Sequence, residues 1–151
     1  MPGYGIQGPQ EGDGLLPWSF VAERMAAARN YWINTTRPDG RPHATPVWGL
    51  WFDGRFYFSA GHNSRKARNL AADPRLIVHL ESGDEVVIFE GQVEMLSPDE
   101  SLFAELDTAY HRKYSFNLIR SEPLYLLHPS IAYAWREVDF PTSSTRWLFE
   151  P

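Results

Sequence analysis

The dipeptide Asp53-Gly54 is the feature that most constrains the fold of this chain. It separates two runs rich in β-branched and aromatic residues, 43–52 and 55–60. In that setting Asp-Gly is a strong signal for a β-hairpin, because glycine readily adopts the positive φ that such turns require. The turn sequence Arg37-Pro38-Asp39-Gly40 separates the run 43–52 from another β-rich run, 31–36. Three consecutive antiparallel strands are therefore expected.

The rest of the chain continues this pattern. Aromatic residues make up 15% of the sequence, with 12 Pro and 11 Gly, a mixture typical of turn-rich β proteins. Further strands are predicted at 76–80, 86–95, 124–127 and 131–135, and helices at 18–30, at 63–72 and from a capping box, Ser97-Pro98-Asp99-Glu100, to about residue 113. The predicted fold is mainly β: a small six-stranded antiparallel barrel with two or three short helices.

The strand 46–52 is apolar on both faces. Alternation places Val47 and Trp51 on one face and Trp48, Leu50 and Phe52 on the other. A strand with one wet face would alternate apolar and polar residues, so something besides the barrel core must cover the second face. A subunit partner or a flat aromatic ligand would do so. The run 86–89 shows the same pattern, and the barrel is expected to be dimeric.

Length and composition bound the class of protein. The 151 residues fit one domain, expected at 17–151, and residues 1–16, with five Gly and two Pro, are expected to be a flexible tail. The absence of cysteine excludes disulfides, thiolate metal sites and cysteine nucleophiles. A net charge of -5 argues against general nucleic-acid or anionic-membrane binding, and no apolar run reaches the length of a membrane span. We expect a soluble, cytoplasmic protein.

The segment 62–70 is the most suggestive for chemistry. Ser64, Arg65, Lys66 and Arg68 gather at the start of a predicted helix, where unpaired backbone amides already favour an anion. Arginine offers a bidentate fork and lysine a mobile charge. Two interpretations stay open: a phosphate-binding cradle, or a solvated basic helix face.

The other groups of polar and aromatic residues give weaker evidence of function. The five histidines are far apart in sequence and none has i, i+4 spacing, so no metal site is expected. The chain has no nucleophile elbow, no phosphate-binding loop and no dinucleotide fingerprint. Glu81, Asp84 and Glu85 are interpreted as a solvated hairpin tip. Trp147 and Phe149, close to the C-terminus, are expected to dock either on a partner or as an intrachain lid over the barrel.

The residues between about 31 and 94 resemble a known family. The resemblance depends on the order of four pieces: Arg37-Pro38-Asp39-Gly40-Arg41-Pro42-His43-Ala44-Thr45-Pro46-Val47-Trp48, Phe56-Tyr57-Phe58-Ser59, Ser64-Arg65-Lys66-Ala67-Arg68-Asn69-Leu70 and Asp73-Pro74-Arg75. Together they are similar to the pyridoxamine 5'-phosphate oxidase-like superfamily of split-barrel flavin and deazaflavin oxidoreductases. The resemblance implies a split barrel and a homodimer with two cofactor sites along its interface.

The resemblance also assigns cofactor-binding roles. It implies that Ser64, Arg65 and Lys66, with Arg68 beside them, hold a phosphate, and that Thr45, Pro46, Val47 and Trp48 lie along the ring. Tyr57, Phe58 and Ser59 run beside the ribityl chain, and the C-terminal stretch contributes Trp135 and Arg146, from either subunit. Members of the similar branches use FMN or the deazaflavin F420, and the same cradle serves both.

Departures from the family pattern argue against vitamin B6 oxidation. The pyridoxal phosphate-forming oxidases have an Arg and a Lys on the ring-facing strand, where this chain has Thr45 and Leu50, and their closing Arg-x-His motif has no counterpart near Arg146.

The function hypothesis is an FMN- or F420-dependent oxidoreductase that transfers a hydride between the ring and a small planar conjugated molecule. No catalytic side chain is required, since the ring performs the redox step. Trp48, Trp51 and either Trp135 or Trp147 are expected to form an apolar wall beside it. The alternatives are a flavin-binding carrier or sensor without turnover, and a barrel that binds haem or another tetrapyrrole through a histidine.

Overall fold

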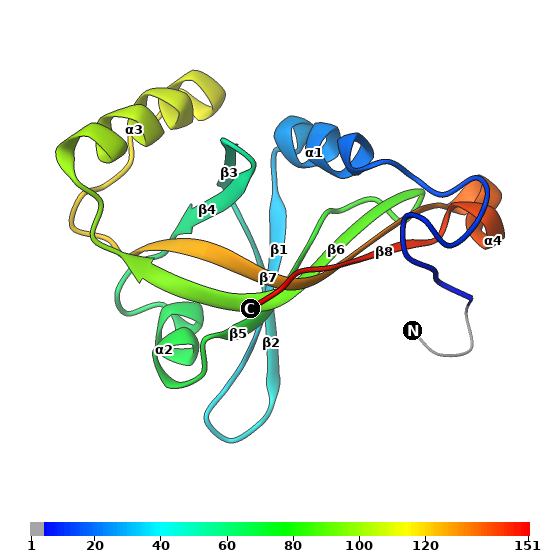
Figure 1. The fold of residues 1–151 in the computed structure, drawn as a ribbon. Helices are drawn as coiled ribbons and strands as arrows, with labels where there is room; N and C mark the ends of the chain where they lie inside the picture. The colour runs from blue at the N-terminus through cyan, green and yellow to red at the C-terminus, as the bar shows by residue number, and fades with distance from the viewer. Residues whose placement is uncertain (1–4) are drawn as a thin grey trace.

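The computed structural model describes residues 5–151 and contains one antiparallel sheet of eight strands (Figure 1). The strand order is β2-β1-β5-β6-β7-β4-β3, with β8 beside β7. The strands are β1 Tyr31–Thr36, β2 Pro42–Val47, β3 Gly49–Phe52, β4 Arg55–Ser59, β5 Arg75–His79, β6 Glu85–Leu96, β7 Leu124–Arg136 and β8 Thr145–Leu148. The helices are α1 Trp18–Ala27, α2 Arg65–Ala72, α3 Glu100–Tyr114 and α4 Phe140–Ser143, with a 3₁₀ turn at Glu137–Asp139.

The two outermost strands of the main strand order, β2 and β3, are consecutive in the chain, separated by Trp48 alone. The chain itself therefore joins the two edges, and the sheet curls into a split barrel, as expected. The predicted strand 43–52 is divided at Trp48 into β2 and β3. At Gly49, the first residue of β3, a Cβ would lie 2.7 Å from Cζ of Phe56, so the close packing there requires glycine. The break at Trp48 and the additional strand β8 raise the number of strands above the predicted six.

The turn between β3 and β4 is the one predicted. Asp53 has φ of 50° and Gly54 has φ of 71°. Two consecutive residues with positive φ are the signature of the turn that suits the twist of a tight hairpin. By contrast, the two predicted closing strands form the single long strand β7, which pairs with β6 through an irregularity at Glu90/Gly91.

The barrel core is closed by two helices. Phe20, Val21 and Met25 of α1 and Ala67 and Leu70 of α2 share one buried cluster with the inward side chains of the strands. Figure 1 shows α1 and α2 on opposite sides of the long strands β6 and β7. The core is thus sealed within one chain.

Helix α3 covers the second apolar face of the strand 46–52. Leu106 of α3 is fully buried and packs in a separate cluster with Leu50 and Tyr57. The expectation that a partner or a ligand covers this face was wrong, because the cover is a helix of the same chain. The helix is capped by Asp99, whose carboxylate accepts from the amide of Leu102 at 2.7 Å; the predicted capping residue, Ser97, lies outside it.

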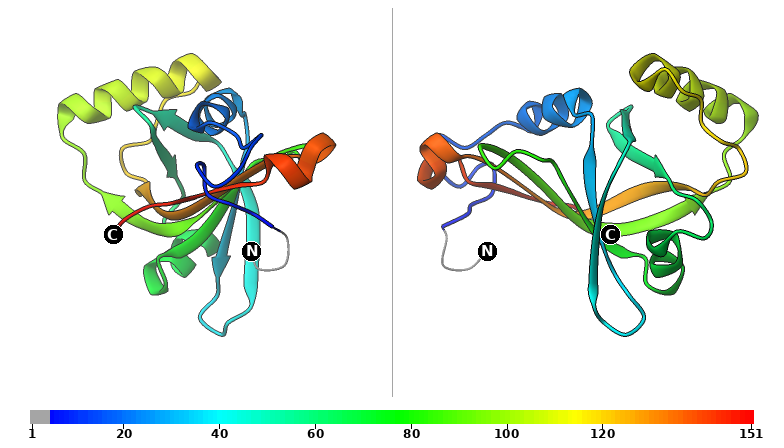
Figure 2. Two further views of the ribbon diagram at one scale, coloured as in Figure 1. Left: turned by 45° about the vertical axis from the view of Figure 1, so that its right-hand side comes forward. Right: turned by 180° about the vertical axis from the view of Figure 1, so that it is seen from behind.

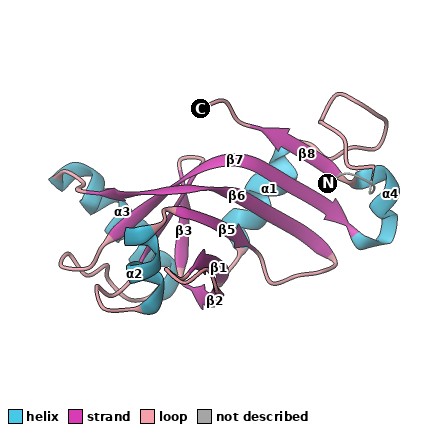
Figure 3. Ribbon diagram, turned by 90° about the horizontal axis from the view of Figure 1, so that it is seen from below, coloured by secondary structure: helices cyan, strands magenta, loops and turns pink. Residues whose placement is uncertain are grey.

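Helices α1, α2 and α3 pack into the two buried clusters, whereas a second sheet face meets the short helix α4, where Phe140 contacts Trp135 edge to face. Cross-strand pairing aligns Trp32, His79, Ile88, Tyr133 and Arg146 in one row across β1, β5, β6, β7 and β8. This set, with Ile77, Trp135 and Leu148, is called the outer face below. Figure 3 shows β5 to β8 side by side, with α4 at the end of β7. Ile77 is 39% exposed and Leu148 67% exposed, so the outer face presents apolar groups to solvent.

Both ends of the chain attach to this sheet. The segment 5–16 was expected to belong to a flexible tail, but Ile6 is buried, Gln7 bridges to Thr145, and the amide of Leu16 donates to Oγ1 of Thr145 at 2.9 Å. Figure 2 shows the N-terminal segment running alongside β8. Residues 1–4 lie outside the described residues.

At the other end, Trp147 and Phe149 pack on Trp18, which selects the intrachain lid of the two alternatives. Within residues 5–151, no helix is long and apolar enough to span a bilayer.

Candidate cofactor site

The first turn of α2 positions two of the predicted phosphate-binding residues. The hydroxyl of Ser64 accepts from the amide of Ala67 at 3.2 Å and donates to the carbonyl of Gly61 at 2.8 Å. Its single proton is therefore used within the chain, and Ser64 acts as the helix cap. The helix geometry leaves the amides of Arg65 and Lys66 without an intrahelical acceptor, so they remain available to an anion.

The β1–β2 hairpin brings His43 and Arg37 to the same place. Burial lowers the pKa of His43 below its ordinary value of 6.5, and the nearby charges of Arg37, Lys66 and Arg65 lower it further. The structure thus gathers three cations around one imidazole. We call Arg37, His43, Arg65 and Lys66 the cradle.

The cations of the cradle form no ion pairs among residues 5–151, although the carboxylate of Asp39 lies within electrostatic reach of Arg37. The Nδ1 atom of His43 is buried without a hydrogen-bond partner. Buried polar atoms are seldom left unpaired, so this nitrogen needs a partner such as an ordered water or a bound group.

A buried polar contact ties α2 to this hairpin. Nδ2 of Asn69 donates to Oγ1 of Thr35 at 3.0 Å, and Thr35 pairs with His43 across the two strands. Asn69 is fully buried and its Oδ1 has no partner within the described residues. The helix and the hairpin are therefore fixed relative to each other.

Arg68 stands apart from the cradle. It is exposed on α2 and is not among the charges that lower the pKa of His43. The structure therefore brings together Arg65 and Lys66, but not Arg68, with two residues of the hairpin.

The predicted ring-facing residues lie on an edge strand and its end. Thr45 is half-buried and Pro46 is exposed on β2, whereas Val47 is buried in the barrel core. Because β2 pairs only with β1, the backbone groups on its other side have no sheet partner. Trp48 is already stacked on Tyr114 of α3, so its ring faces that helix.

The predicted ribityl-binding residues on β4 are mostly packed within the chain. Phe58 is 2% exposed in the barrel core, and Tyr57 is 6% exposed beneath α3. Ser59 is half-buried. For the side chains of Tyr57 and Phe58 to contact a ribityl chain, this packing would have to change. Without such a change, β4 can offer a cofactor only its backbone and Ser59.

Trp135 and Arg146 lie far from the cradle in the sheet. They belong to the outer face, on β7 and β8, whereas the cradle is built on the β1–β2 hairpin and α2. Within one chain the structure does not bring them to the predicted site. The Nε of Arg146 is nevertheless buried without a partner.

The expected tryptophan wall does not form within one chain. Trp51 and Trp147 both adjoin Trp18, Trp48 stacks on Tyr114, and Trp135 meets Phe140 edge to face. These are three separate places. The positions of these tryptophans in the sequence do not reveal which face of the sheet each indole lies on.

A wide groove begins beside the cradle. It has a volume of about 1010 Å³ and crosses the sheet from the β1–β2 hairpin to the C-terminus. Its lining includes Thr36 and Pro42 at one end, Arg75 and Glu90 along its course, and His128 opposite. This volume is at the upper end of the range for small-molecule sites, roughly 300–1,000 Å³.

Arg37 and His43 were not identified as site residues from the sequence. The signal that could have found them is the Pro38-Asp39-Gly40 turn, because a tight turn pairs the residues that flank it and places them at one end of the sheet. No group of three or more His, Asp or Glu side chains among the described residues is arranged to hold a metal ion.

The cradle at the start of a short helix, beside the first hairpin of a split barrel, agrees with the comparisons with known proteins. The family model for pyridoxamine 5'-phosphate oxidase matches residues 20–135, well over half of the chain. The chain belongs to the pyridoxamine 5'-phosphate oxidase family. The matched region contains every member of the cradle and most of the barrel. A search of curated proteins found no match.

Solved structures of this family's fold include proteins of different functions. The conserved hypothetical protein Rv2991 from Mycobacterium tuberculosis is 24% identical, with 80% of this chain and 85% of that chain covered and a TM-score of 0.71. A protein described as an F420 reductase is 20% identical, with 73% and 94% covered and a TM-score of 0.57. The haem storage protein HutZ from Vibrio cholerae is 16% identical, with 72% and 87% covered and a TM-score of 0.60. At these identities the likeness concerns the fold.

Proposed function

We propose that this protein is an oxidoreductase that binds FMN or F420, with the cofactor phosphate in the cradle. The observation that carries the proposal is the set of three cations, without carboxylate partners among the described residues, around the orphan Nδ1 of His43. On a protein with a net charge of -5, such a concentration of positive charge is a local feature and suits a phosphate.

Each member of the cradle has a distinct role in this proposal. Arg37 and Arg65 offer planar forks to the phosphate oxygens and Lys66 a mobile ammonium, while the free amides at the start of α2 add two fixed donors. His43 lies within electrostatic reach of these cations and packs under the site through its buried side-chain nitrogen. Ser64 caps the helix and so aims these amides, rather than contacting the phosphate through its own proton.

The edge strand β2 and the adjoining groove suit the remainder of the cofactor. On the open edge of β2 the carbonyl of Pro46 can accept from the polar edge of a ring, whereas Pro46 has no N–H, so the donor on that edge is the amide of Ala44. When bound, either ring supplies the hydride or electron transfer of the reaction. The protein contributes binding, orientation and the exclusion of water. The second substrate would be a small planar conjugated molecule.

A homodimer is part of the proposal. The outer face exposes apolar side chains and carries Arg146, whose Nε has no partner in this chain. A second copy seated on this face would bury these groups, and it is the arrangement in which Trp135 and Arg146 of one copy can approach the cradle of the other.

The test begins with the absorption spectrum and the mass of whatever co-purifies with the protein, followed by direct titration with FMN and with F420. The double variant Arg65→Gln/Lys66→Gln is expected to lose at least tenfold in affinity, since charge-assisted hydrogen bonds contribute roughly 1.5–3 kcal/mol each. Arg68→Gln, one turn further along α2, is the matched control and is expected to change affinity less than threefold. An unchanged affinity in the double variant would show that the cradle does not hold the cofactor phosphate.

Anaerobic reduction then separates an enzyme from a carrier. A bound ring that is reduced and passes its electrons to a planar acceptor such as a quinone supports the oxidoreductase. A ring that binds tightly but transfers to none of the acceptors tried supports a carrier or sensor.

Haem binding is the second candidate. His128 lies on the wall of the large groove, with Nε2 3.1 Å from the carboxylate of Glu94, and could serve as an axial ligand. Structural neighbours include HutZ and a protein described as a heme binding protein from Mycobacterium smegmatis. Reconstitution with haem that gives a strong Soret band, lost in His128→Ala, would favour this candidate over the flavin reading.

A further inference from the structure

A second pocket lies at the mouth of the barrel, between the β3–β4 hairpin, α1 and the C-terminal segment. It has a volume of about 160 Å³ and shares no lining residue with the cradle, but it adjoins the large groove, with which it shares His128, Pro129 and Phe149. Its lining consists of Trp18, Trp51, Gly54, Arg55, Phe56, Phe89, Leu126, Leu127, His128, Pro129 and Phe149.

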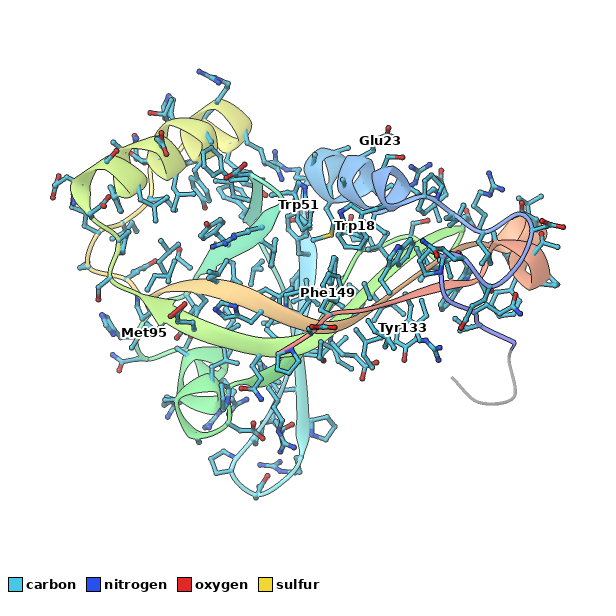
Figure 4. The ribbon with its side chains drawn as sticks, in the orientation of Figure 1. Trp18, Glu23, Trp51, Met95, Tyr133 and Phe149 are labelled. Carbon is cyan, nitrogen blue, oxygen red and sulfur yellow. The ribbon has the colours of Figure 1, made fainter. Side chains whose placement is uncertain are left out.

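Aromatic rings form most of its walls. Around Trp18, the centroids of Trp51, Phe89 and Phe149 lie at 6.5, 6.1 and 5.6 Å. Figure 4 shows Trp18 and Trp51 next to each other beneath α1, with Phe149 below them. The rings of Phe89 and Phe149 are nearly perpendicular to Trp18, at 87° and 70°. Walls of this kind favour a flat aromatic guest, which can meet some rings edge to face and others offset.

The polar part of the lining offers a cation and no carboxylate. It contains Arg55 and His128 and no aspartate or glutamate. His128 is held by Glu94, whereas Arg55 is exposed and forms no ion pair with any carboxylate among residues 5–151. Arg55 is therefore the cation left to meet a charge on a bound molecule.

We infer that this pocket binds a small aromatic carboxylate, with its ring against the cluster of Trp18, Trp51 and Phe149 and its carboxylate at Arg55. The size fits one ring, since a cavity of about 150 Å³ in another protein takes up benzene. A guanidinium can hold a carboxylate through two parallel hydrogen bonds. Aromatic walls alone would also suit a cationic guest, but the positive charge of Arg55 repels it.

Phe149 is the movable wall. It follows β8, two residues before the C-terminus, and is held by a backbone hydrogen bond from its amide to the carbonyl of Ser130 at 3.0 Å. For the segment after Leu148 to open, this hydrogen bond and the contact of the Phe149 ring with Trp18, at 5.6 Å between centroids, must break. Entry of the guest therefore requires displacement of the C-terminal end and leaves the barrel intact.

Calorimetric titration of the full chain with three probes tests the inference. Benzoate supplies the ring and the charge, benzyl alcohol the ring without the charge, and cyclohexanecarboxylate the charge without the flat ring. Benzoate is expected to bind at least tenfold more tightly than either of the other two. Equal affinity for benzoate and benzyl alcohol would overturn the role of Arg55, and absence of benzoate binding would overturn the site.

Two variants locate the probe. Arg55→Gln is expected to lower benzoate affinity at least tenfold and to leave benzyl alcohol within twofold, while Phe149→Ala is expected to weaken both probes. Arg65→Gln/Lys66→Gln is the control, because a carboxylate could also enter the cradle. If the control variant abolishes benzoate binding and Arg55→Gln does not, the probe sits in the cradle and the inference is wrong. Unfolding curves of every variant confirm that the chain is folded.

Discussion

The indole of Trp48 lies stacked on the ring of Tyr114, with centroids 4.6 Å apart and planes inclined by 8°. This contact joins the break between β2 and β3 to the end of α3. The hydroxyl of Tyr114 accepts from the amide of Gly49 at 3.0 Å and lies 2.7 Å from the carbonyl oxygen of Arg29. One side chain thus satisfies the backbone at the point where the barrel edges join.

Replacement of Tyr114 by Phe keeps the stacking and removes this hydroxyl. The buried amide of Gly49 then loses its acceptor, and an unsatisfied buried group costs about 1–3 kcal/mol. Urea unfolding is expected to show a loss of that size. Tyr110→Phe is the matched control, since the Tyr110 ring packs against Tyr114 at a tilt of 50° and none of the hydrogen bonds of Gly49 involves its hydroxyl. Equal effects of the two variants would contradict the assignment.

Lys113 is expected to make the free energy of unfolding depend on pH in the alkaline range. Its ammonium donates to the hydroxyl of Tyr31 at 2.7 Å, and burial, with the nearby charge of Arg29, lowers its pKa from 10.5 to about 8. Between these two values the unfolded chain binds more protons than the folded one, so the unfolding free energy rises with pH. Above pH 10 the trend reverses, because burial raises the pKa of Tyr114 to about 12 and the unfolded tyrosine ionises first.

The expected rise between pH 8 and 10 is about 1 kcal/mol, allowing for solvent screening of a partly exposed group. Lys113→Met is expected to abolish it, and Arg112→Met, the neighbouring exposed cation, to keep it. Urea titrations at pH 8, 9 and 10 measure the difference. A rise that survives in Lys113→Met would assign it to another group.

The pKa of His43 reports directly on the cradle. Burial lowers it first, and the charges of Arg37, Lys66 and Arg65 add to the effect. In Arg65→Gln/Lys66→Gln two of the three charges are gone, so the pKa is expected to rise towards 6.5 without reaching it. Arg68→Gln is expected to leave it unchanged. Imidazole resonances followed by NMR during a pH titration provide the measurement, and no shift in the double variant would mean that these side chains point away from His43.

Local chemistry was predicted well from the sequence. The turn at Asp53-Gly54 depends on a few neighbouring residues, and it was predicted. The cluster of Arg65 and Lys66 was visible for the same reason. Such signals do not depend on how the rest of the chain is placed.

Long-range packing was not predicted. The two-sided apolar strand 46–52 indicated correctly that a cover was needed, but the cover is α3, about fifty residues further along the chain. Two other features were missed for the same reason: the docking of Gln7 on Thr145 and the separation of the tryptophans. Both depend on strand order, which decides the faces that meet. Arg37 and His43 join the cradle only because β1 and β2 pair in this register.

Gly91 marks the place where β6 shifts register against β7. A Cβ there would lie 2.8 Å from Cα of Pro129 and still closer to the carbonyl of His128, and neither backbone atom can move without the strand. Gly91→Ala is expected to destabilise the protein by about 1–3 kcal/mol, as overpacking does elsewhere. Gly83→Ala, whose Cβ would meet nothing within 4 Å, is the control and is expected to be near neutral in thermal unfolding.

Ile77 provides the sharpest test of the proposed dimer. It lies on β5 at the outer face, beside Glu90 of β6, and is 39% exposed in the single chain. Ile77→Glu would place a second carboxylate next to Glu90, so a second copy seated there would bury two like charges, which is strongly unfavourable. Sedimentation is expected to show a dimer for the unchanged protein and a monomer for this variant.

Met95→Glu is the matched control for that experiment. Met95 is 65% exposed on the same sheet, but towards the far end of β6, where Figure 4 shows it away from Tyr133. It is expected to leave the dimer intact. If Met95→Glu dissociates the protein and Ile77→Glu does not, the copies meet through the end of the sheet that borders α3, and Trp135 and Arg146 remain on the solvent side of each chain. The cradle would then have to hold its cofactor with the residues of one subunit.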